Sequence, residues 1–402
     1  MALNLRTLTA DDLPEFQRVV NSAFLSDSVE DQLERWRGLF EPDRHHAVFD
    51  GGELIGGGGI QTREITLPGA GPTPVAAVTS VGVKPGHRRR GVLTRVMRAQ
   101  LHGMHEEGTE AIAALWSSEA AIYPRFGYGL AAEFARLEVP HGAKFRPGVA
   151  TGGERVREVS RDEAVPVMKA VYEDLRPSRT GWLSRTDAAW DHHLADTERD
   201  RDGLSAYRYV LHPQGYAVYR IKADWHVRGP RNELHVREIA ARTDEAYAAL
   251  YRYLLDVDMV GELKFFTASD DPAVHLLEDS RLALRGRSDS LWVRIVDVDR
   301  ALPLRRYLSD VDVVLELSDE FCPWNAGRWR FTVKGGEATV QRVDDDPDVV
   351  LDVQALGAAY LGGTRLATLA RAQRVSEVTA GALNVLSHAL LGDREPHCPE
   401  VF

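Results

Sequence analysis

The chain has 402 residues, a formal net charge of −11, and 44% hydrophobic and 27% charged residues, a balance that predicts a folded protein of two or three domains. Its acidic surface argues against nucleic-acid binding and favours cationic small molecules as ligands. We expect a cytoplasmic protein without a membrane partner. No apolar run could span a bilayer, the N-terminus lacks a signal-peptide pattern, and Cys322 and Cys398 are too few for a disulfide scaffold.

Residues 1–143 are predicted to form a first domain in which helices and strands alternate. Residues 9–12 have a capping-box pattern and precede apolar residues at helical spacing. A second helix is expected over residues 29–40. The expected strands cover residues 46–49, 53–61, 76–83 and 111–116, and a tight segment follows at 120–129.

The segment from Val78 to Met97 is the most informative in the chain. A strand ends at the turn residues Pro85 and Gly86, and the loop 87–91, HRRRG, leads into apolar residues at helical spacing. A helix that begins just after a glycine presents free backbone N–H groups and the positive end of its dipole. A solvated helix start would explain the charges as well, but the glycine among the arginines favours a site for a phosphorylated ligand.

Residues 144–296 are predicted to form a second domain with the same strand–helix–strand order. A helix over 244–255 follows Thr243, which is a suitable N-cap with acidic residues in the next turn. No arginine–glycine loop precedes this helix, so the second copy is not expected to hold phosphates itself. The expected strands are 206–211, 216–221, 234–240 and 263–266.

Residues 297–402 change pattern and are predicted to form a third domain of four short strands followed by helices. Gly335 and Gly336 fit a hairpin turn between two of the strands. The chain ends on Phe402, which is unusual because terminal segments are normally polar and poorly ordered. The expected strands are 313–317, 328–333, 338–343 and 349–353, and the expected helices are 354–361, 365–371 and 380–391.

Three other patterns carry no catalytic interpretation. The glycines at 56–59 lack the Gly-Lys-Ser/Thr that would follow in a phosphate-binding Walker loop. The histidine pairs at 45–46 and 192–193 are adjacent in sequence, and neighbouring side chains rarely chelate one metal, so no metal site is expected. No serine lies in a Gly-x-Ser-x-Gly setting, which argues against a hydrolase nucleophile of that type.

The loop HRRRGVL resembles the acyl-coenzyme-A loop of the GCN5-related N-acetyltransferases (GNATs), Arg/Gln-x-x-Gly-x-Gly/Ala. Arg88 and Gly91 occupy its first two fixed positions, while Leu93 departs from the superfamily pattern. That departure, the segment SSEAAIYPRFGYG, two acetyltransferase-like parts, a strand–helix tail and the terminal Phe402 together resemble the enhanced intracellular survival (Eis) family of actinobacteria. The resemblance extends over the whole chain.

This resemblance implies a mixed α/β (α+β) fold with tandem GNAT domains and a C-terminal sterol-carrier-like domain. It also implies a homohexamer that transfers acetyl groups from acetyl-CoA to several amines of aminoglycoside antibiotics. The residues implied in coenzyme binding are Val81, Gly82 and Val83 for the pantetheine arm, Arg88, Arg89, Arg90, Gly91, Val92, Leu93 and Thr94 for the pyrophosphate, and Ser118 and Glu119 beside the acetyl end.

The resemblance also assigns the proton transfers. Tyr123 becomes the general acid, since a tyrosine with a pKa of roughly 10 keeps its proton at neutral pH. The general base becomes the main-chain carboxylate of Phe402, whose pKa burial would raise from its low ordinary value. Trp36, Asp27 and Glu400 are candidates for binding a cationic substrate, because aromatic rings and carboxylates suit polyamino ligands.

Two alternatives stay open at this point. Protein lysines or polyamines could be the acceptors of the same reaction. A non-catalytic acyl-CoA or lipid-binding protein is an alternative from a different class, suggested by the sterol-carrier-like tail. Tyr123 and the terminal Phe402 argue against it, because binding alone needs neither. A long-chain acyltransferase is a third reading, but no long acyl pocket is indicated.

Overall fold

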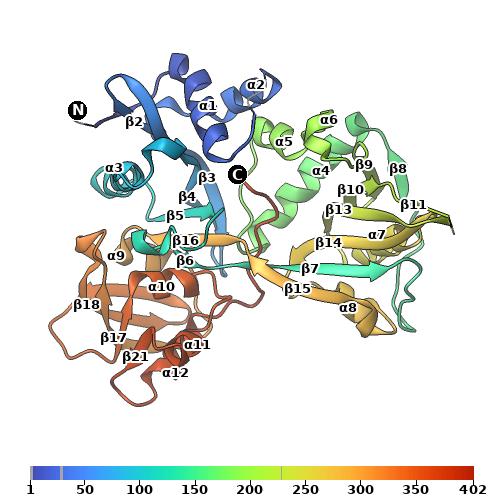
Figure 1. Ribbon diagram of the computed structural model, residues 1–402. Helices are drawn as coiled ribbons and strands as arrows, with labels where there is room; N and C mark the ends of the chain where they lie inside the picture. The colour runs from blue at the N-terminus through green and yellow to red at the C-terminus, as the bar shows by residue number, and fades with distance from the viewer. Residues whose placement is uncertain (1–2, 28–29, 228) are drawn as a thin grey trace.

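The computed structural model describes residues 3–27, 30–227 and 229–402, and it has the expected mixed α/β fold. Two sheets of seven strands form the first and second domains, and a sheet of five strands forms the third. The C-terminus lies between the first two domains, although the third domain that precedes it packs below the first (Figure 1). In the described part of the chain, no helix is both long and apolar enough to cross a membrane.

The first sheet has the order β1-β2-β3-β4-β5-β16-β6. Its helices begin where the sequence predicts, since Thr9 and Asp12 form the expected capping box just ahead of α1. The second helix is seen from Glu30, and Val29 lies outside the described residues. The bounds are β1 Asn4–Thr7, α1 Leu13–Ala23, α2 Glu30–Leu39, β2 His45–Asp50, β3 Glu53–Leu67, β4 Gly71–Val83, α3 Val92–Glu107, β5 Ile112–Trp116, β6 Gly129–Leu130 and β16 Leu291–Ile295.

The second sheet has the order β15-β7-β14-β13-β10-β9-β8. The capped helix expected after Thr243 is present, and its Thr243 side chain accepts a hydrogen bond from the Ala246 N–H. The bounds are β7 Glu133–Pro140, β8 Arg157–Val159, α4 Arg161–Leu175, α5 Asp187–His193, α6 Glu198–Arg201, β9 Arg208–His212, β10 Gly215–Lys222, β11 Trp225–His226, β12 Gly229–Pro230, β13 Asn232–Ala241, α7 Asp244–Leu255, β14 Val260–Ala268, α8 Ala273–Leu276 and β15 Leu284–Asp289.

Two strands belong to the sheet of the other domain rather than to that of their own sequence segment. Strand β7 precedes residue 143, yet it pairs with β14 and β15 in the second sheet. Strand β16 precedes residue 296, yet it lies between β5 and β6 in the first sheet. The division at 143 and 296 therefore describes the sequence, whereas each of the first two sheets includes a strand from the other segment.

The third domain has the sheet order β19-β18-β17-β20-β21 and packs against the first sheet. One apolar core runs through both, from Val75 and Val293 in the first sheet to Leu315 and Phe331 in the third. The bounds are α9 Val298–Ala301, β17 Val311–Ser318, β18 Gly327–Lys334, β19 Glu337–Arg342, β20 Val349–Asp352, α10 Val353–Ala359, α11 Leu366–Arg371, β21 Val375–Glu377 and α12 Ala382–Ala389.

The tail after α12 leaves the third domain and runs back between the first two (Figure 1). The His397 N–H donates to the Thr180 carbonyl at 3.0 Å. At Gly181 the backbone has a φ of +91°, and a Cβ there would lie 2.7 Å from the His397 carbonyl oxygen. A glycine at this position thus lets the tail approach the second domain closely.

Candidate active site

A groove opens where the parallel strands β4 and β5 separate. The two strands pair at Ala76–Ala113 and Ala77–Ala114 and then diverge. Strand β4 carries a register shift against β3, and Ser80 within it has a left-handed φ of 53°. Beyond this bulge, the backbone of Gly82 and Val83 pairs with β3 on one side. Its other side therefore faces the opening, where a pantetheine arm could add to the strand edge.

The arginine–glycine loop leads from β4 into α3 as expected. Gly91 is the N-cap of α3 with a φ of 76°, and no side chain in the described part of the chain caps the helix. Residues 88–91 are exposed, and nothing lies within 4 Å of the place where a Gly91 Cβ would be. The first N–H groups of α3, from Val92 to Thr94, are therefore available to phosphate oxygens, and the donor set fits a coenzyme pyrophosphate.

The arginines of this loop differ in their contacts. Arg90 forms an ion pair with Asp50 at 2.8 Å, and Arg88 donates to the Ala23 carbonyl at 3.4 Å. Arg89 has a left-handed φ of 62°. Exposed and flexible side chains of this kind can reorient toward a phosphate group, while the backbone at Gly91 provides the fixed part of the site.

A cavity of about 670 Å³ lies at the inner end of the groove. It is enclosed by the end of α1 and by α2, by strands β3 and β4, by the segment after β5, and by the C-terminal tail. Of the residues expected from the sequence, it brings together Trp36, Val81, Ser118, Tyr123, Glu400 and Phe402.

Tyr123 opens into this cavity with a largely buried side chain. Burial raises the pKa of its phenol to about 12, although Arg125 opposes the shift. A raised pKa means that the phenol holds its proton more strongly, so the hydroxyl stays protonated at neutral pH. Its ring packs edge-on against Tyr128, with ring centroids 5.8 Å apart. Among the described residues its hydroxyl has no hydrogen-bond partner, which leaves it available to a ligand in the cavity.

Phe402 lines the same cavity. It is half-buried and packs against the apolar core that the first and third domains share. Val401 is 58% exposed, whereas Glu400 is only 4% exposed. The end of the chain is thus anchored at Glu400 and at Phe402, beside the cavity that Tyr123 also lines.

The three residues expected to bind the substrate differ in whether they line the cavity. Trp36 lines the cavity and lies 6.3 Å from Phe16, centroid to centroid. Asp27 is exposed and is not part of the cavity wall; its backbone carbonyl instead accepts a hydrogen bond from Arg199. Glu400 borders the cavity, but Arg63 and Arg185 engage its two carboxylate oxygens, so its charge is already neutralised. The structure thus does not bring the Asp27 carboxylate to the cavity that it was expected to line.

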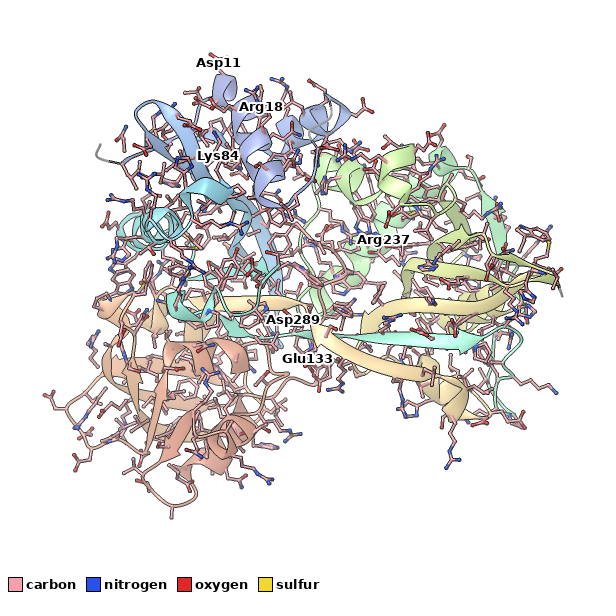
Figure 2. The ribbon with its side chains drawn as sticks, viewed as in Figure 1. Asp11, Arg18, Lys84, Glu133, Arg237 and Asp289 are labelled. Atoms are coloured by element: carbon pink, nitrogen blue, oxygen red, sulfur yellow. The ribbon has the colours of Figure 1, made fainter. Side chains whose placement is uncertain are left out.

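Sequence reasoning missed several cavity residues. Arg63 comes from β3, Arg237 from β13 of the second domain, and His45 from β2. Arg237 lies where the first two domains face each other (Figure 2). Burial lowers the pKa of His45 to about 4, so this imidazole is neutral at pH 7. None of these residues belongs to a motif, and only the approach of the second domain reveals Arg237.

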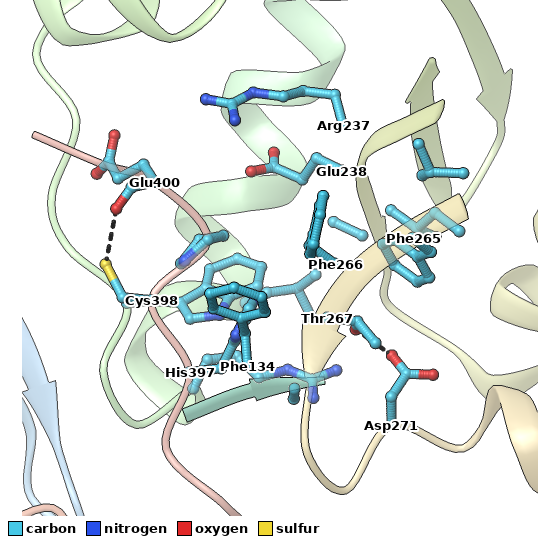
Figure 3. A pocket seen from close by; sticks show the side chains of 18 of the residues that line it. Phe134, Arg237, Glu238, Phe265, Phe266, Thr267, Asp271, His397, Cys398 and Glu400 are labelled. Atoms are coloured by element: carbon cyan, nitrogen blue, oxygen red, sulfur yellow. Dashed lines mark hydrogen bonds between the residues drawn. The ribbon is translucent and has the colours of Figure 1, made fainter. Parts of the chain in front are cut away.

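A second cavity, of about 480 Å³, lies at the equivalent divergence of β13 and β14 in the second domain (Figure 3). Trp116, Arg237, Glu400 and Val401 border both cavities, so the tail separates them. The helix at this divergence, α7, is capped by Thr243 and has acidic residues in its first turn. Those features oppose a phosphate ligand, as expected for the second copy.

Comparison with known proteins places this architecture. Residues 4–131 and 181–295 match acetyltransferase (GNAT) domains, and residues 298–399 match a sterol carrier protein domain. The chain is 34% identical to N-acetyltransferase Eis of Mycobacterium tuberculosis over 98% of each protein. The protein belongs to the Eis-like N-acetyltransferases of the GNAT superfamily. Its GNAT domains imply acetyl-CoA as the acetyl donor.

Other Eis-like relatives support the same conclusion. An uncharacterized N-acetyltransferase of Streptomyces avermitilis is 38% identical over 100% of each chain. The crystal structure of Eis1 from Mycobacterium abscessus matches 100% of each chain with a TM-score of 0.87 and 33% identity. A GCN5-related N-acetyltransferase from Anabaena variabilis, at 18% identity and a TM-score of 0.84, shares the fold. In the residues that the structure describes, no cluster of three His, Cys, Asp or Glu side chains could hold a metal ion.

Replacing Gly91 by alanine is expected to weaken acetyl-CoA binding. A left-handed φ costs an alanine about 1–2 kcal/mol, so the free loop of the variant should relax to another conformation. Restoring the binding conformation then raises the dissociation constant roughly tenfold. Titration calorimetry with coenzyme A measures this constant. Gly103, inside α3 with equal space around it, is the matched control, and Gly103→Ala should leave the constant unchanged. Equal affinity of Gly91→Ala and the unmodified protein would contradict the role of the loop.

Proposed function

We propose that this Eis-like enzyme acetylates amines of a multi-amine acceptor such as an aminoglycoside, at more than one position. The supporting observation is that Tyr123 and Phe402 line one cavity at the inner end of the coenzyme groove. An acid and a base in one cavity suit direct attack of an amine on a thioester. Trp36 adds an aromatic wall for a cationic ligand. A homohexamer in the cytoplasm remains part of the proposal.

Acetyl-CoA supplies an activated acetyl group when bound. The Phe402 carboxylate accepts a proton from the acceptor nitrogen as the new amide bond forms. The Tyr123 hydroxyl gives a proton to the sulfur of the departing coenzyme as the carbon–sulfur bond breaks. The Phe402 carboxyl group then loses its proton to solvent, and the Tyr123 phenolate takes up a proton from solvent. The backbone of residues 81–83 and the N-terminus of α3 hold the coenzyme in line with this cavity.

One observation favours a second acceptor class. Arg237 borders the cavity, and the charge of Glu400 is neutralised by Arg63 and Arg185. A guanidinium group at the cavity suits a substrate that carries carbonyl or carboxylate oxygens within reach of the acceptor amine. A peptide has backbone carbonyls several bonds away from its lysine amine, whereas a polyamine such as spermidine has no such oxygens. Protein lysine is therefore the second candidate acceptor.

The acceptor is tested by measuring free thiol release from acetyl-CoA with kanamycin, spermidine and a lysine peptide. We expect turnover with kanamycin and products that carry more than one acetyl group by mass spectrometry. Faster turnover with the peptide would select the second candidate. A protein that binds acetyl-CoA and releases no thiol with any amine would contradict the proposed acceptors.

Tyr123→Phe is expected to lower kcat about 100-fold or more, the scale of a lost general acid. The dissociation constant of acetyl-CoA should stay the same, because the phenyl ring remains. Tyr128→Phe is the matched control: its hydroxyl is buried and has no partner among the described residues, so its removal should leave kcat unchanged. Steady-state kinetics on both variants, near neutral pH where a phenol of pKa about 12 is protonated, provide the measurement. Equal loss in both variants would assign Tyr123 to packing alone.

Adding one glycine after Phe402 is expected to reduce kcat at least tenfold. The added residue moves the carboxylate by up to about 3.5 Å, away from the position where it meets the acceptor. The same glycine added at the N-terminus is the control and should be harmless. Full activity of the extended chain would exclude the terminal carboxylate as the base.

A further inference from the structure

The position of the proposed base depends on its anchorage. The proposed base is a terminal carboxylate, and terminal residues are mobile unless they are tied down. Val401 is exposed, and the nearest buried polar anchor is Glu400. A shift of about 1 Å in a reacting group can reduce the rate by two orders of magnitude. What fixes Glu400 therefore contributes to where the carboxylate lies, together with the packing of the Phe402 side chain.

Glu400 is held from both GNAT domains. Its Oε1 accepts a hydrogen bond from Arg63 of β3 at 2.6 Å, and its Oε2 accepts one from Arg185 at 3.2 Å. The Arg63 and Glu400 side chains are each 4% exposed, and that of Arg185 is fully buried. A charge-assisted contact in such a water-free environment is strong and directional.

Arg185 is in turn held by Glu238 of β13. Two of its nitrogens donate to the two Glu238 oxygens, at 3.2 and 2.7 Å. Its guanidinium also lies over the rings of Tyr172 and Trp190, at 4.0 and 4.6 Å from their centroids. Glu238 projects from β13 toward the tail that carries Glu400 (Figure 3). Arg185 is consequently fixed between aromatic rings and two carboxylates.

The four side chains form a balanced cluster, which we call the tail clamp: Arg63, Arg185, Glu238 and Glu400. Burial alone would raise the pKa of Glu238, but the charge of the Arg185 guanidinium outweighs it and holds this pKa well below its usual range. His193 itself is neutral, since burial lowers its pKa to about 3. Two guanidinium groups and two carboxylates thus cancel, and loss of any one leaves an uncompensated buried charge.

We propose that Arg63, Arg185 and Glu238 are positioning residues for acetyl transfer, which act through Glu400 to fix the Phe402 carboxylate opposite Tyr123. The second GNAT domain lacks a coenzyme loop, yet it provides half of the clamp that holds the base of the first domain. Its role in the reaction is to orient that base. This inference rests on the proposed function of the terminal carboxylate.

Glu238→Gln tests the clamp from the second domain, because it removes one charge without changing size and lies outside the first cavity. We expect kcat to fall 10- to 100-fold while KM for acetyl-CoA stays within twofold. Glu238→Asp keeps the charge and should recover part of kcat. Carboxypeptidase should release Phe402 faster from Glu238→Gln than from the unmodified protein, which reports the freedom of the tail without reference to activity.

Glu110→Gln is the matched control. Glu110 is 4% exposed and accepts two hydrogen bonds from Arg44, at 2.7 and 2.9 Å, but neither residue borders either cavity. Its loss leaves Arg44, whose side chain is 22% exposed, without its carboxylate partner and away from the tail. We therefore expect reduced thermal stability with kcat and Phe402 release unchanged. An equal fall of kcat in Glu110→Gln and Glu238→Gln would reduce the clamp to a stabilising contact and overturn the inference.

The outcomes separate the inference from the function on which it rests. Full activity of a chain extended after Phe402 would exclude the terminal carboxylate as the base and would contradict the proposed function itself. If extension after Phe402 abolishes activity but a folded Glu238→Gln variant keeps full kcat, the terminal carboxylate remains the proposed base and only the clamp is overturned. If Glu238→Gln does not fold, Arg63→Lys probes the clamp from the first domain, because a lysine keeps the charge but loses the planar pairing. Unchanged kcat and tail release in that variant likewise overturn the inference.

Discussion

The tail clamp joins parts of the chain that are distant in sequence. Arg63 belongs to the first domain, Arg185 and Glu238 to the second, and Glu400 to the tail that leaves the third. A neutral group of buried charges demands that every partner be present, since the cost of a lone buried charge exceeds the gain from any one pair. The clamp therefore links the folding of three domains to the geometry of one cavity. In our proposal the position of Phe402 depends on it. The clamp also adds to the other contacts between the first two domains, such as the hydrogen bonds of Glu64 with Ser184 and Arg176.

The two GNAT domains share the same sheet architecture but differ at the start of the helix that follows the central strand. Both have diverging parallel strands with a cavity at the divergence. In the first, Gly91 leaves the helix N-terminus uncapped and surrounded by arginines. In the second, Thr243 occupies the corresponding N-terminus and acidic residues follow it. The two domains thus differ at the start of one helix, while the sheet, and the surface it offers to the tail, are present in both.

Features encoded by neighbouring residues could be predicted from the sequence. The loop at 87–91, the capping signals at Thr9 and Thr243 and the three-part organisation are local patterns, and the structure has them. Tyr123 and Phe402 came from family resemblance, and both reach one cavity. Asp27 was expected there because it lies near Trp36 in sequence, yet its side chain faces solvent. The clamp could not be predicted, because a lone Arg or Glu in a strand has no signal until tertiary contacts give it a partner.

The exchange of β7 and β16 affects the order in which the protein can assemble. The first sheet lacks the strand between β5 and β6 until residues 291–295 have been synthesised, so the first domain cannot finish folding as the ribosome releases it, unlike domains that fold in sequence.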